Sequence, residues 1–408
     1  MGVLDYIGII GIIVLLGIGY IASSNRKAIN PRTIFSALAL QFAIALFVFK
    51  TKTGEKTLLG LTNGIEHVLN YANSGIGFVF GGLQTSDSIG FTFAVWVLPV
   101  IIFVGALMTV LFHLGIMQMV MRAFGFVLRR IIGVNGVEAL AASMNIFVGQ
   151  DSAPFAVRPY LATMPKSTLF LIMVTGMATI AGSILAGLIQ MGVTAQYLVV
   201  ASFMGAPAGI LMAKLMMPTD PDEPEFGPDS VKIENTKHRN VIEAAAVGAS
   251  EGVQLAITIG AMLIAFISLI ALLNGIIGGV GGLFGFDNWS FQNFLGWLFR
   301  PLMTVVGVPW AEAGLSGSLF GEKLILNEFV AYASMVGLGE GAMSVRAETI
   351  TTIALCGFAN FSSIAIVLGG VGTLAPERRG DLAAFGMKAV LAASLANLLS
   401  AAMVGLLI

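Results

Sequence analysis

Long apolar runs separated by short polar segments make up most of the chain. Eight of these runs approach twenty residues, the length that an α-helix needs to cross the hydrocarbon core of a bilayer. They lie at about 4–22, 33–50, 92–115, 167–190, 196–217, 253–275, 347–370 and 383–406. The pattern predicts an all-α integral membrane protein with about eight transmembrane helices.

The segments between the runs predict how the chain is divided. Residues 53–82 carry apolar residues at helical spacing among polar ones, which is typical of an amphipathic helix in the membrane interface. Residues 218–240 are rich in proline and acidic residues and predict a long polar loop that links two halves. We therefore expect spans within 1–52, 92–115 and 241–275, the interfacial helix at 53–82, a first repeat at 116–217 and a second repeat at 285–408.

Basic residues between the spans predict the orientation in the membrane. The loop with Arg26, Lys27 and Arg32 is expected on the cytoplasmic side, which places the N-terminus outside. An even number of spans then places the C-terminus outside too. The first span has no basic flank before it and no cleavage pattern after it, so we expect it to be retained rather than removed as a signal peptide. The basic residues at 122–130 and 378–379 agree with this orientation, whereas the lysines at 50–56 do not.

Two further apolar regions do not fit ordinary spans. Residues 136–165 are interrupted by Gly149, Pro154 and Pro159 and contain several polar residues. Residues 307–340 show the same mixture of glycines and charged residues. Each arm is roughly ten to fifteen residues long, which is too short to cross a bilayer but suits a segment that enters and returns. Both regions are predicted to be re-entrant helical hairpins.

The two hairpins begin with the same motif. Gly-Val-x-x-x-Glu-Ala occurs at 133–139 and again at 307–313, and each hairpin is followed by a span with a polar interior. Repeated units of a hairpin and an interrupted helix are typical of secondary transporters, which bind solute near the membrane midplane between the repeats. If the hairpins enter from opposite sides, as the number of spans requires, the repeats are inverted.

Composition excludes several other classes of protein. The net charge of −1 gives no electrostatic basis for binding nucleic acid, and the single cysteine, Cys356, excludes an intrachain disulfide framework. The three histidines lie outside both repeats, which argues against an intramembrane hydrolase and identifies no catalytic residue. Channels also use re-entrant loops but usually lack a chemically mixed site for an organic solute. A secondary transporter remains the best interpretation.

Asp151 is an acidic residue at the centre of the first hairpin. A carboxylate at the bilayer centre costs about 2.5–3.5 kcal/mol on insertion scales, so this residue is expected to face a water-filled cavity or a polar ligand. Alternatively, Asp151 or Ser152 caps the second helix of the hairpin, since both residue types are good N-caps. The two roles are compatible.

Four motifs carry a resemblance to a known family. They are NIFVGQ at 145–150, EAAAVGASEG at 243–252, ILNEFVAY at 325–332 and the long LCGFANFSSIAIVLGGVGTLAPERRGDLA from Leu355. The chain resembles the concentrative nucleoside transporters, in particular bacterial, sodium-coupled members, over nearly its whole length. The resemblance implies nucleoside uptake across the inner membrane and a homotrimer in which each protomer has a scaffold and a mobile transport domain that carries both hairpins. It further implies elevator-type alternating access and no cofactor other than sodium as the coupling ion.

The resemblance also implies a set of binding residues. In the family the nucleobase contacts Gln150 and the two residues after it, Asp151 and Ser152, with Ile184 and Leu255 as apolar walls. The ribose contacts Glu328, Asn360 and Ser363, and Phe358 lies beside the ligand. The chemistry agrees, because an acid can accept two hydroxyl protons while an amide and a hydroxyl three residues apart share one helix face. Ser363 could instead bond to a backbone carbonyl, and Glu328 could pair with Lys323.

Sodium requires several hard oxygen ligands, which unwound helix carbonyls and side-chain amides or hydroxyls provide. The residues that match the family's sodium site are Asn145 and Thr179, with the carbonyls of Val148 and Ile180. Asn145 could instead tie the hairpin to a neighbouring helix. Proton coupling, or another small polar solute, remains an alternative to sodium-coupled nucleoside uptake.

The hairpin tip departs from the family pattern. The family reads Gly-Gln-Thr-Glu or Gly-Gln-Ser-Glu, whereas this chain reads Gly149-Gln150-Asp151-Ser152. The acid is one methylene shorter and one position earlier. The preference for purine or pyrimidine nucleosides therefore does not follow from the resemblance.

Overall fold

The computed structural model describes residues 3–85, 92–150, 152–220, 238–285, 289–339 and 341–408. Helices connected by short turns account for its regular structure in these ranges, and no strand occurs in them. The predicted all-α class is confirmed. Asp151 lies outside the described residues, so neither of its two predicted roles is tested by the structure.

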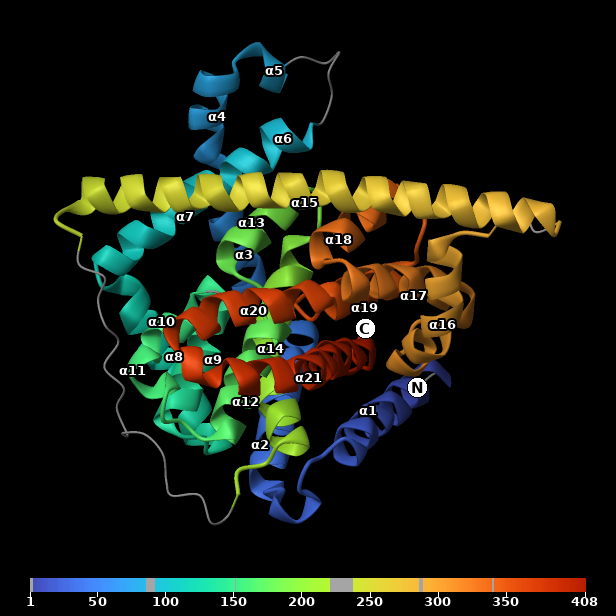
Figure 1. The fold of residues 1–408 in the computed structure, drawn as a ribbon, viewed down its shortest axis with the longest axis horizontal. Coiled ribbons are helices and arrows are strands. Elements are labelled where there is room, and N and C mark those ends of the chain that lie inside the picture. Colours follow the sequence, from blue (N-terminus) through green and yellow to red (C-terminus); the bar gives the residue numbers. More distant parts are fainter. Residues whose placement is uncertain (1–2, 86–91, 151, 221–237, 286–288, 340) are drawn as a thin grey trace.

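The N-terminal region contains three helices of 19 or 20 residues followed by shorter ones (Figure 1). They are α1 (Val3–Ile21), α2 (Pro31–Lys50), α3 (Lys52–Asn70), α4 (Ala72–Phe80), α5 (Gly82–Thr85), α6 (Phe93–Trp96) and α7 (Leu98–His113), with a 3-10 turn at Arg26–Ala28. The single helix expected at 53–82 is wrong in detail. The chain breaks at Tyr71 and again at Gly81, whose φ of 52° lies in the region that favours glycine.

The segment expected to be the first repeat contains seven helices. They are α8 (Ile116–Ile132), α9 (Gly136–Val148), α10 (Ala153–Ala156), α11 (Arg158–Leu161), α12 (Lys166–Ala178), α13 (Gly182–Gln190) and α14 (Ala195–Met216). The run predicted at 167–190 is interrupted after Ala178, which produces α12 and α13.

The corresponding helices recur in the same order in the C-terminal segment. They are α16 (Phe291–Val306), α17 (Trp310–Ile325), α18 (Glu328–Gly337), α19 (Val345–Leu355), α20 (Phe361–Leu374) and α21 (Arg379–Gly405), with a 3-10 turn at Pro376–Arg378. Each segment thus has a preceding helix, two hairpin arms, an interrupted helix and a final long helix. The interruption in this second segment falls between Leu355 and Phe361.

Helix α15 (Val241–Leu283) lies between the two segments and is much longer than the predicted span at 253–275. Its 43 residues correspond to about 65 Å at 1.5 Å per residue, roughly twice the thickness of the hydrocarbon core. It crosses one side of the molecule along α7 (Figure 1). The two helices touch at glycines, since a Cβ added to Gly248 would lie 2.5 Å from the Gly105 carbonyl oxygen.

Six helical segments in the described ranges are long and apolar enough to cross a membrane, and a seventh is obtained if α16 and α17, bent by 116°, are counted as one. The six are Pro31–Lys50, Phe93–His113, Lys166–Gln190, Ala195–Met216, Val241–Leu283 and Pro376–Gly405. Two predicted spans are not among them. The run at 4–22 forms α1, which has 19 residues and is apolar over Ile7–Ile21, and the run at 347–370 is divided between α19 and α20.

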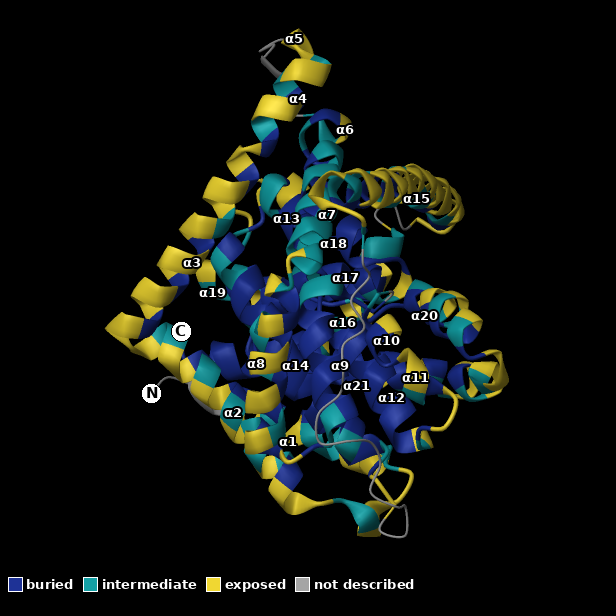
Figure 2. Cartoon of the chain, turned by 90° about the vertical axis from the view of Figure 1, so that its left-hand side faces the viewer, coloured by how far each residue is buried: buried dark blue, intermediate teal, exposed yellow. Residues whose placement is uncertain are grey.

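The buried centre of the molecule consists of α9, α12, α14 and α21, whereas α3 and α15 lie at the periphery with exposed faces (Figure 2). Small residues permit the central packing. A Cβ added to Gly205 on α14 would lie 2.7 Å from the carbonyl oxygen of Ala178, the last residue of α12. Helices α1 and α21 pack together, with Gly8 against Leu406, so both ends of the chain lie on the same side of the structure (Figure 1).

Candidate functional site

The first hairpin begins at a capping box. Asn135 accepts a hydrogen bond from the Glu138 amide (2.8 Å), and the Glu138 carboxylate accepts one from the Asn135 amide (3.3 Å). Helix α9 ends at Gly149, which has a φ of 83°. The second arm is divided into α10 and α11, with Pro154 in the first turn of α10 and Pro159 in the first turn of α11, where proline is tolerated. Gly149, Gln150 and Ser152, the described residues of the tip between α9 and α10, are not helical.

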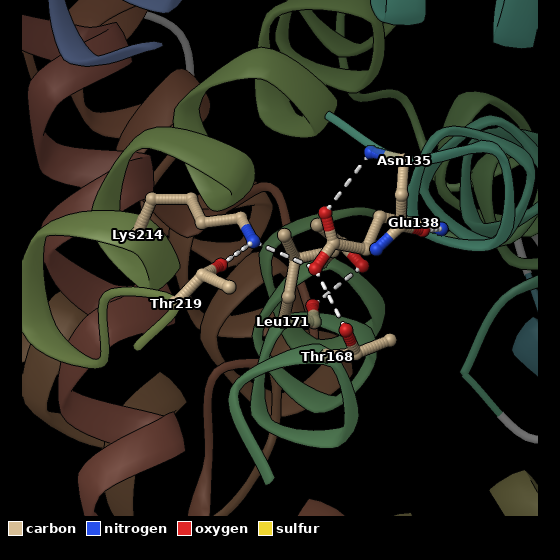
Figure 3. A network of polar contacts seen from close by, with 7 residues as sticks. Asn135, Glu138, Thr168, Leu171, Lys214 and Thr219 are labelled. Atoms are coloured by element: carbon tan, nitrogen blue, oxygen red, sulfur yellow. Dashed lines mark hydrogen bonds and ion pairs between the residues drawn. The ribbon is translucent and has the colours of Figure 1, made fainter. Parts of the chain in front are cut away.

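The base of this hairpin is held by a buried carboxylate (Figure 3). Glu138 accepts hydrogen bonds from the Thr168 hydroxyl (2.9 Å) and from the Lys214 ammonium (2.7 Å). The same ammonium donates to the Thr219 hydroxyl (2.7 Å). Helices α9, α12 and α14 are thereby joined at one point, so the first arm of the hairpin is fixed to two long helices of the same segment.

The second hairpin turns at only two residues, Leu326 and Asn327. The Asn327 side chain caps α18 by accepting a hydrogen bond from the Val330 amide (3.0 Å). Glu328 is the first residue of α18, where the helix dipole favours a negative charge. Glu312, the glutamate of the recurring motif, accepts from the backbone amide and hydroxyl of Ser344, the N-cap of α19. Glu312 thus anchors its hairpin to the following helix, as Glu138 does.

The two interrupted helices meet at their interruptions. The Phe358 amide donates to the Thr179 carbonyl oxygen (3.3 Å). Gly357 has a φ of 148°, and a Cβ there would lie 3.0 Å from the Ala178 carbonyl oxygen. Because only glycine fits this conformation and this space, the two unwound segments, 179–181 and 356–360, contact each other at the centre of the protein.

Four of the predicted solute-binding residues lie together beside these segments. The Gln150 amide donates to the Ser363 hydroxyl (2.8 Å), and the Asn360 amide donates to the Glu328 carboxylate (3.0 Å). The side-chain oxygen of Asn360, Oδ1, accepts a hydrogen bond from the Ser363 backbone amide (2.9 Å), so that Asn360 caps α20. All four side chains are buried, and Gln150 Oε1 has no partner. Residues from both hairpins and from α20 therefore converge into one polar cluster.

The contacts bear on two alternatives that the sequence leaves open. The Ser363 hydroxyl accepts a bond from the other half of the chain, and among the described residues no bond runs from it to a backbone carbonyl. Lys323 donates to the Ala354 carbonyl oxygen (2.9 Å) and to Asn397 Oδ1 (2.8 Å), while Glu328 bonds to Asn360. Glu328 is therefore not held as the ion-pair partner of Lys323. The cluster therefore offers a solute two kinds of group: the Gln150 amide, whose oxygen is a free acceptor, and the Glu328 carboxylate, which also accepts hydrogen bonds.

The other predicted solute residues are more scattered among the elements. Ser152 is half-buried at the start of α10, and Phe358 is half-buried in the unwound segment before α20. Ile184 is buried on α13, and Leu255 is half-buried on α15. In the described part of the chain no side-chain hydrogen bond joins these residues to the polar cluster, so their role stays a prediction.

The four predicted sodium-site residues come from two places that adjoin. Asn145 and Val148 lie in the last turn of α9, and Thr179 and Ile180 lie in the unwound segment after α12. The Thr179 hydroxyl donates to the Asn145 carbonyl oxygen (3.0 Å). The Asn145 amide donates to the Thr175 hydroxyl (3.1 Å), whereas Asn145 Oδ1 is buried without a partner. The contact between the hairpin and α12 thus uses the side-chain nitrogen of Asn145 and leaves its side-chain oxygen unpaired.

Asn397 and Lys323 are buried polar residues whose arrangement the sequence interpretation missed. Asn397 on α21 donates to the Ala178 carbonyl oxygen (2.8 Å) and accepts from Lys323. It thereby connects the ends of α12 and α19. A lone asparagine within the apolar run at 383–406 is the signal that could have identified it, because polar residues inside membrane helices are seldom without a role.

Comparison with known proteins gives the family. The pattern described as "Na+ dependent nucleoside transporter C-terminus" matches residues 197–405, and its N-terminal counterpart matches residues 10–83. A pattern described as "Nucleoside recognition" matches residues 94–195.

Similar proteins cover almost the whole chain. An uncharacterized transporter of Haemophilus influenzae is 48% identical, with 98% of this chain and 97% of the relative covered. The nucleoside permease NupC of Helicobacter pylori is 41% identical over 98% of this chain and 97% of its own length.

Solved structures of the protein CNTnw are similar to the present fold. One in an inward-facing substrate-bound state has a TM-score of 0.94 at 44% identity, with 99% of this chain and 98% of the other covered. A variant in an outward-facing state has a TM-score of 0.93 at 44% identity, with 100% and 98% covered. Together with the matched patterns and the identity to the relatives, these similarities establish that the chain belongs to the Na+-dependent nucleoside transporter family, the family of concentrative nucleoside transporters.

Proposed function

We propose that this protein takes up nucleosides across the bacterial inner membrane, coupled to sodium, by elevator-type alternating access. The observation that carries the proposal is the hydrogen bond from Gln150 to Ser363, which lies beside the bond from Asn360 to Glu328. These bonds place a neutral amide from the first hairpin next to a carboxylate from the second. A nucleoside has matching parts, a base with donors and acceptors on its edge and a ribose with adjacent hydroxyls.

In the proposed complex the two parts of the solute divide between the hairpins. Gln150 contacts the base, since an amide can donate and accept at once and its Oε1 is free. Glu328 accepts from the ribose hydroxyls, with Asn360 and Ser363 completing that side. A carboxylate forms charge-assisted hydrogen bonds, which are stronger than neutral ones, so the ribose supplies most of the affinity. In the complex the base takes the place of Ser363 as a partner of the Gln150 amide.

Sodium is proposed to bind between α9 and the unwound segment of α12. The unpaired Asn145 Oδ1, the Thr179 hydroxyl oxygen and the carbonyls of Val148 and Ile180 offer the hard oxygens that this ion requires. One sodium ion that crosses the whole field provides about 2.3 kcal/mol per 100 mV of membrane potential. At about 1.4 kcal/mol per tenfold, this corresponds to roughly 50-fold accumulation of the solute.

For the movement, we propose that both repeats move together against a scaffold formed by α7, α15 and the interfacial α3. The central helices α9, α12, α14 and α21 form one buried block, and α7 and α15 pack mainly on each other. Apolar residues such as Ile257, Ile264 and Leu272 are exposed along α15. We propose that this surface faces lipid and the other subunits of a homotrimer.

The experiment is uptake of labelled uridine and of labelled adenosine into proteoliposomes with an inward sodium gradient. Accumulation above the external concentration is expected with sodium and not with choline, and unlabelled nucleosides should compete whereas free bases and unrelated polar solutes should not. Glu66→Gln on the exposed surface of α3 serves as a control that retains full uptake. Uptake that follows a proton gradient and ignores sodium would contradict the coupling, and competition only by other solutes would contradict the cargo.

A further inference from the structure

Lys323 is a buried lysine that forms no ion pair with any carboxylate in the part of the chain that the structure describes. It lies on α17 in the first arm of the second hairpin and is 0% exposed. Its ammonium donates to two neutral oxygens, the Ala354 carbonyl oxygen (2.9 Å) and Asn397 Oδ1 (2.8 Å). Lys214, in contrast, is paired with Glu138. The Glu328 carboxylate acts on this group electrostatically without being in ion-pair contact, so the two neutral oxygens provide its direct contacts.

The end of α19 provides one of these two oxygens. Ala354 is the penultimate residue of this helix, and its carbonyl is one of the last four that have no partner within the helix. These carbonyls carry the partial negative charge of the helix dipole, which favours a cation. A second group from the same hairpin also caps this end, since the Tyr332 hydroxyl donates to the Thr352 carbonyl oxygen (2.7 Å). The second hairpin thus provides two hydrogen-bond donors to the end of α19, the amine group of Lys323 and the hydroxyl of Tyr332.

The end of α12 has the corresponding position in the first repeat but different chemistry. The first hairpin contributes Asn145, a neutral side chain whose Oδ1 has no partner. The Thr179 hydroxyl donates to the Thr175 carbonyl oxygen (2.9 Å) and the Asn397 amide to the Ala178 carbonyl oxygen (2.8 Å). These groups are neutral as well. One helix end is therefore met by a built-in ammonium, and the other by unpaired oxygen.

We propose that Lys323 is a positioning residue that acts as a fixed cation in the second repeat. In the first repeat, the corresponding place is the proposed site of a mobile ion. The comparison with a mobile ion rests on the proposed sodium coupling. Lys323 binds the Ala354 carbonyl oxygen and thereby fixes the position at which α19 ends. The unwound segment 356–360 follows directly, so the same contact determines the position of Asn360 relative to the solute. Through Asn397, Lys323 is also linked to the end of α12, so the two interruptions keep one relative position.

The test uses two variants, one that removes only the charge of the side chain and one that removes both its charge and its volume. Lys323→Met keeps the length and Lys323→Ala leaves a cavity that a small alkylammonium ion can enter. Binding of labelled uridine to the purified protein in sodium is expected to weaken at least tenfold in both variants. Ethylammonium chloride should restore most of the affinity of Lys323→Ala, whereas the uncharged propanol should not, and neither should affect Lys323→Met. Lys56→Met, on the exposed surface of α3, should bind as the unaltered protein does.

Unaltered affinity in Lys323→Met would show that the methylene chain suffices and would overturn the proposal. So would a folded Lys323→Ala variant that ethylammonium does not restore. The thermal stability of the same samples gives a second readout that needs no solute: ethylammonium should raise the unfolding temperature of Lys323→Ala and leave that of Lys323→Met unchanged. This readout separates the proposal from the proposed function, because it stands even if uridine does not bind. If Lys323→Ala is purified as folded protein only when ethylammonium is present throughout, the proposal is supported, and if the ion makes no difference, it is contradicted.

Discussion

The interruptions in α12 and α19 occupy corresponding places in two segments with the same order of helices, yet they carry opposite chemistry. In α12 the surrounding groups are neutral and include an unpaired oxygen, Asn145 Oδ1. In α19 the ammonium of Lys323 lies against the helix end. The two hairpins also contribute different groups to the polar cluster, the Gln150 amide from the first and the Glu328 carboxylate from the second. The repeated fold supplies a common frame, and the proposed division, with the ion in the first repeat and the sugar at the second hairpin, rests on these differences.

The bases of the two hairpins differ in the same way. Glu138 and Glu312 come from the same recurring motif and each anchors a hairpin to the helix that follows. Glu138 is buried and paired with Lys214, whereas Glu312 is half-buried and bonds to Ser344. The first hairpin is therefore attached by a charged network and the second by a capping interaction, which leads to the largest of the effects expected below.

Glu138→Gln should destabilise the protein far more than Glu312→Gln. Loss of one member of a buried ion pair costs about 3–5 kcal/mol, and the lower end applies here because the Lys214 side chain keeps 11% exposure. Loss of a half-buried hydrogen bond costs about 0.5–1.5 kcal/mol. Thermal unfolding of the two purified variants in the same detergent compares them directly. Equal unfolding temperatures would show that the two anchors are equivalent.

Glu328→Gln should weaken binding of all nucleosides to a similar degree, because the ribose is common to them. A hydrogen bond to a charged acceptor is worth about 1.5–3 kcal/mol, which corresponds to roughly 10- to 100-fold in affinity. Equilibrium binding of uridine, cytidine and adenosine gives the three ratios. A variant that loses one nucleoside and keeps another would assign this carboxylate to the base instead.

Asn145→Ala and Thr179→Val should raise the sodium concentration for half-maximal uptake, on the order of tenfold for the loss of one ligand. The maximal rate at saturating sodium should change little. Thr351→Val is the matched control in the second repeat, since the Thr351 hydroxyl also ties a hairpin to an interrupted helix, through Ser316 (2.8 Å). If that control shifts the sodium dependence as much, the ion is not confined to the first repeat.

The smallest effect is expected at the tip of the first hairpin, where exchange of Asp151-Ser152 for Thr-Glu should alter the ratio of pyrimidine to purine uptake by a few-fold. A site that bonds to a base edge discriminates against a mismatched edge, which leaves buried groups unpaired. Asp151→Asn separates the alternatives, because asparagine caps a helix about as well as aspartate. An unaltered ratio in both variants would assign Asp151 to capping alone.

The features that could be predicted from the sequence are those that local composition encodes. Glycines and prolines within apolar runs indicated the hairpins, and polar residues at 175–183 and 356–363 indicated the interrupted helices. The length of α15 was missed because hydropathy marks the part of a helix that suits a bilayer, not its ends. The break at Tyr71 was missed because amphipathic spacing continues across it.

Contacts between distant segments could not be predicted in the same way. The Gln150–Ser363 bond joins residues 213 positions apart, and only the resemblance to a family had brought these two residues together beforehand. Lys323 and Asn397 are 74 positions apart, and from the sequence Lys323 entered only as an alternative partner of Glu328. From the sequence alone, a buried lysine is expected to pair with a carboxylate. The C-terminal end of a helix can accept its hydrogen bonds instead, but only the tertiary structure shows which helix end lies beside the lysine.

The most direct test of the division between the repeats is a cycle that combines Glu328→Gln with removal of the ribose hydroxyls. Binding of uridine and of 2′,3′-dideoxyuridine is measured for the unaltered protein, for Glu328→Gln and for Gln150→Ala. The account predicts that the Glu328→Gln penalty nearly disappears with the dideoxy compound, while the Gln150→Ala penalty is the same for both compounds. Equal Glu328→Gln penalties for the two compounds would contradict the assignment of the ribose to the second hairpin.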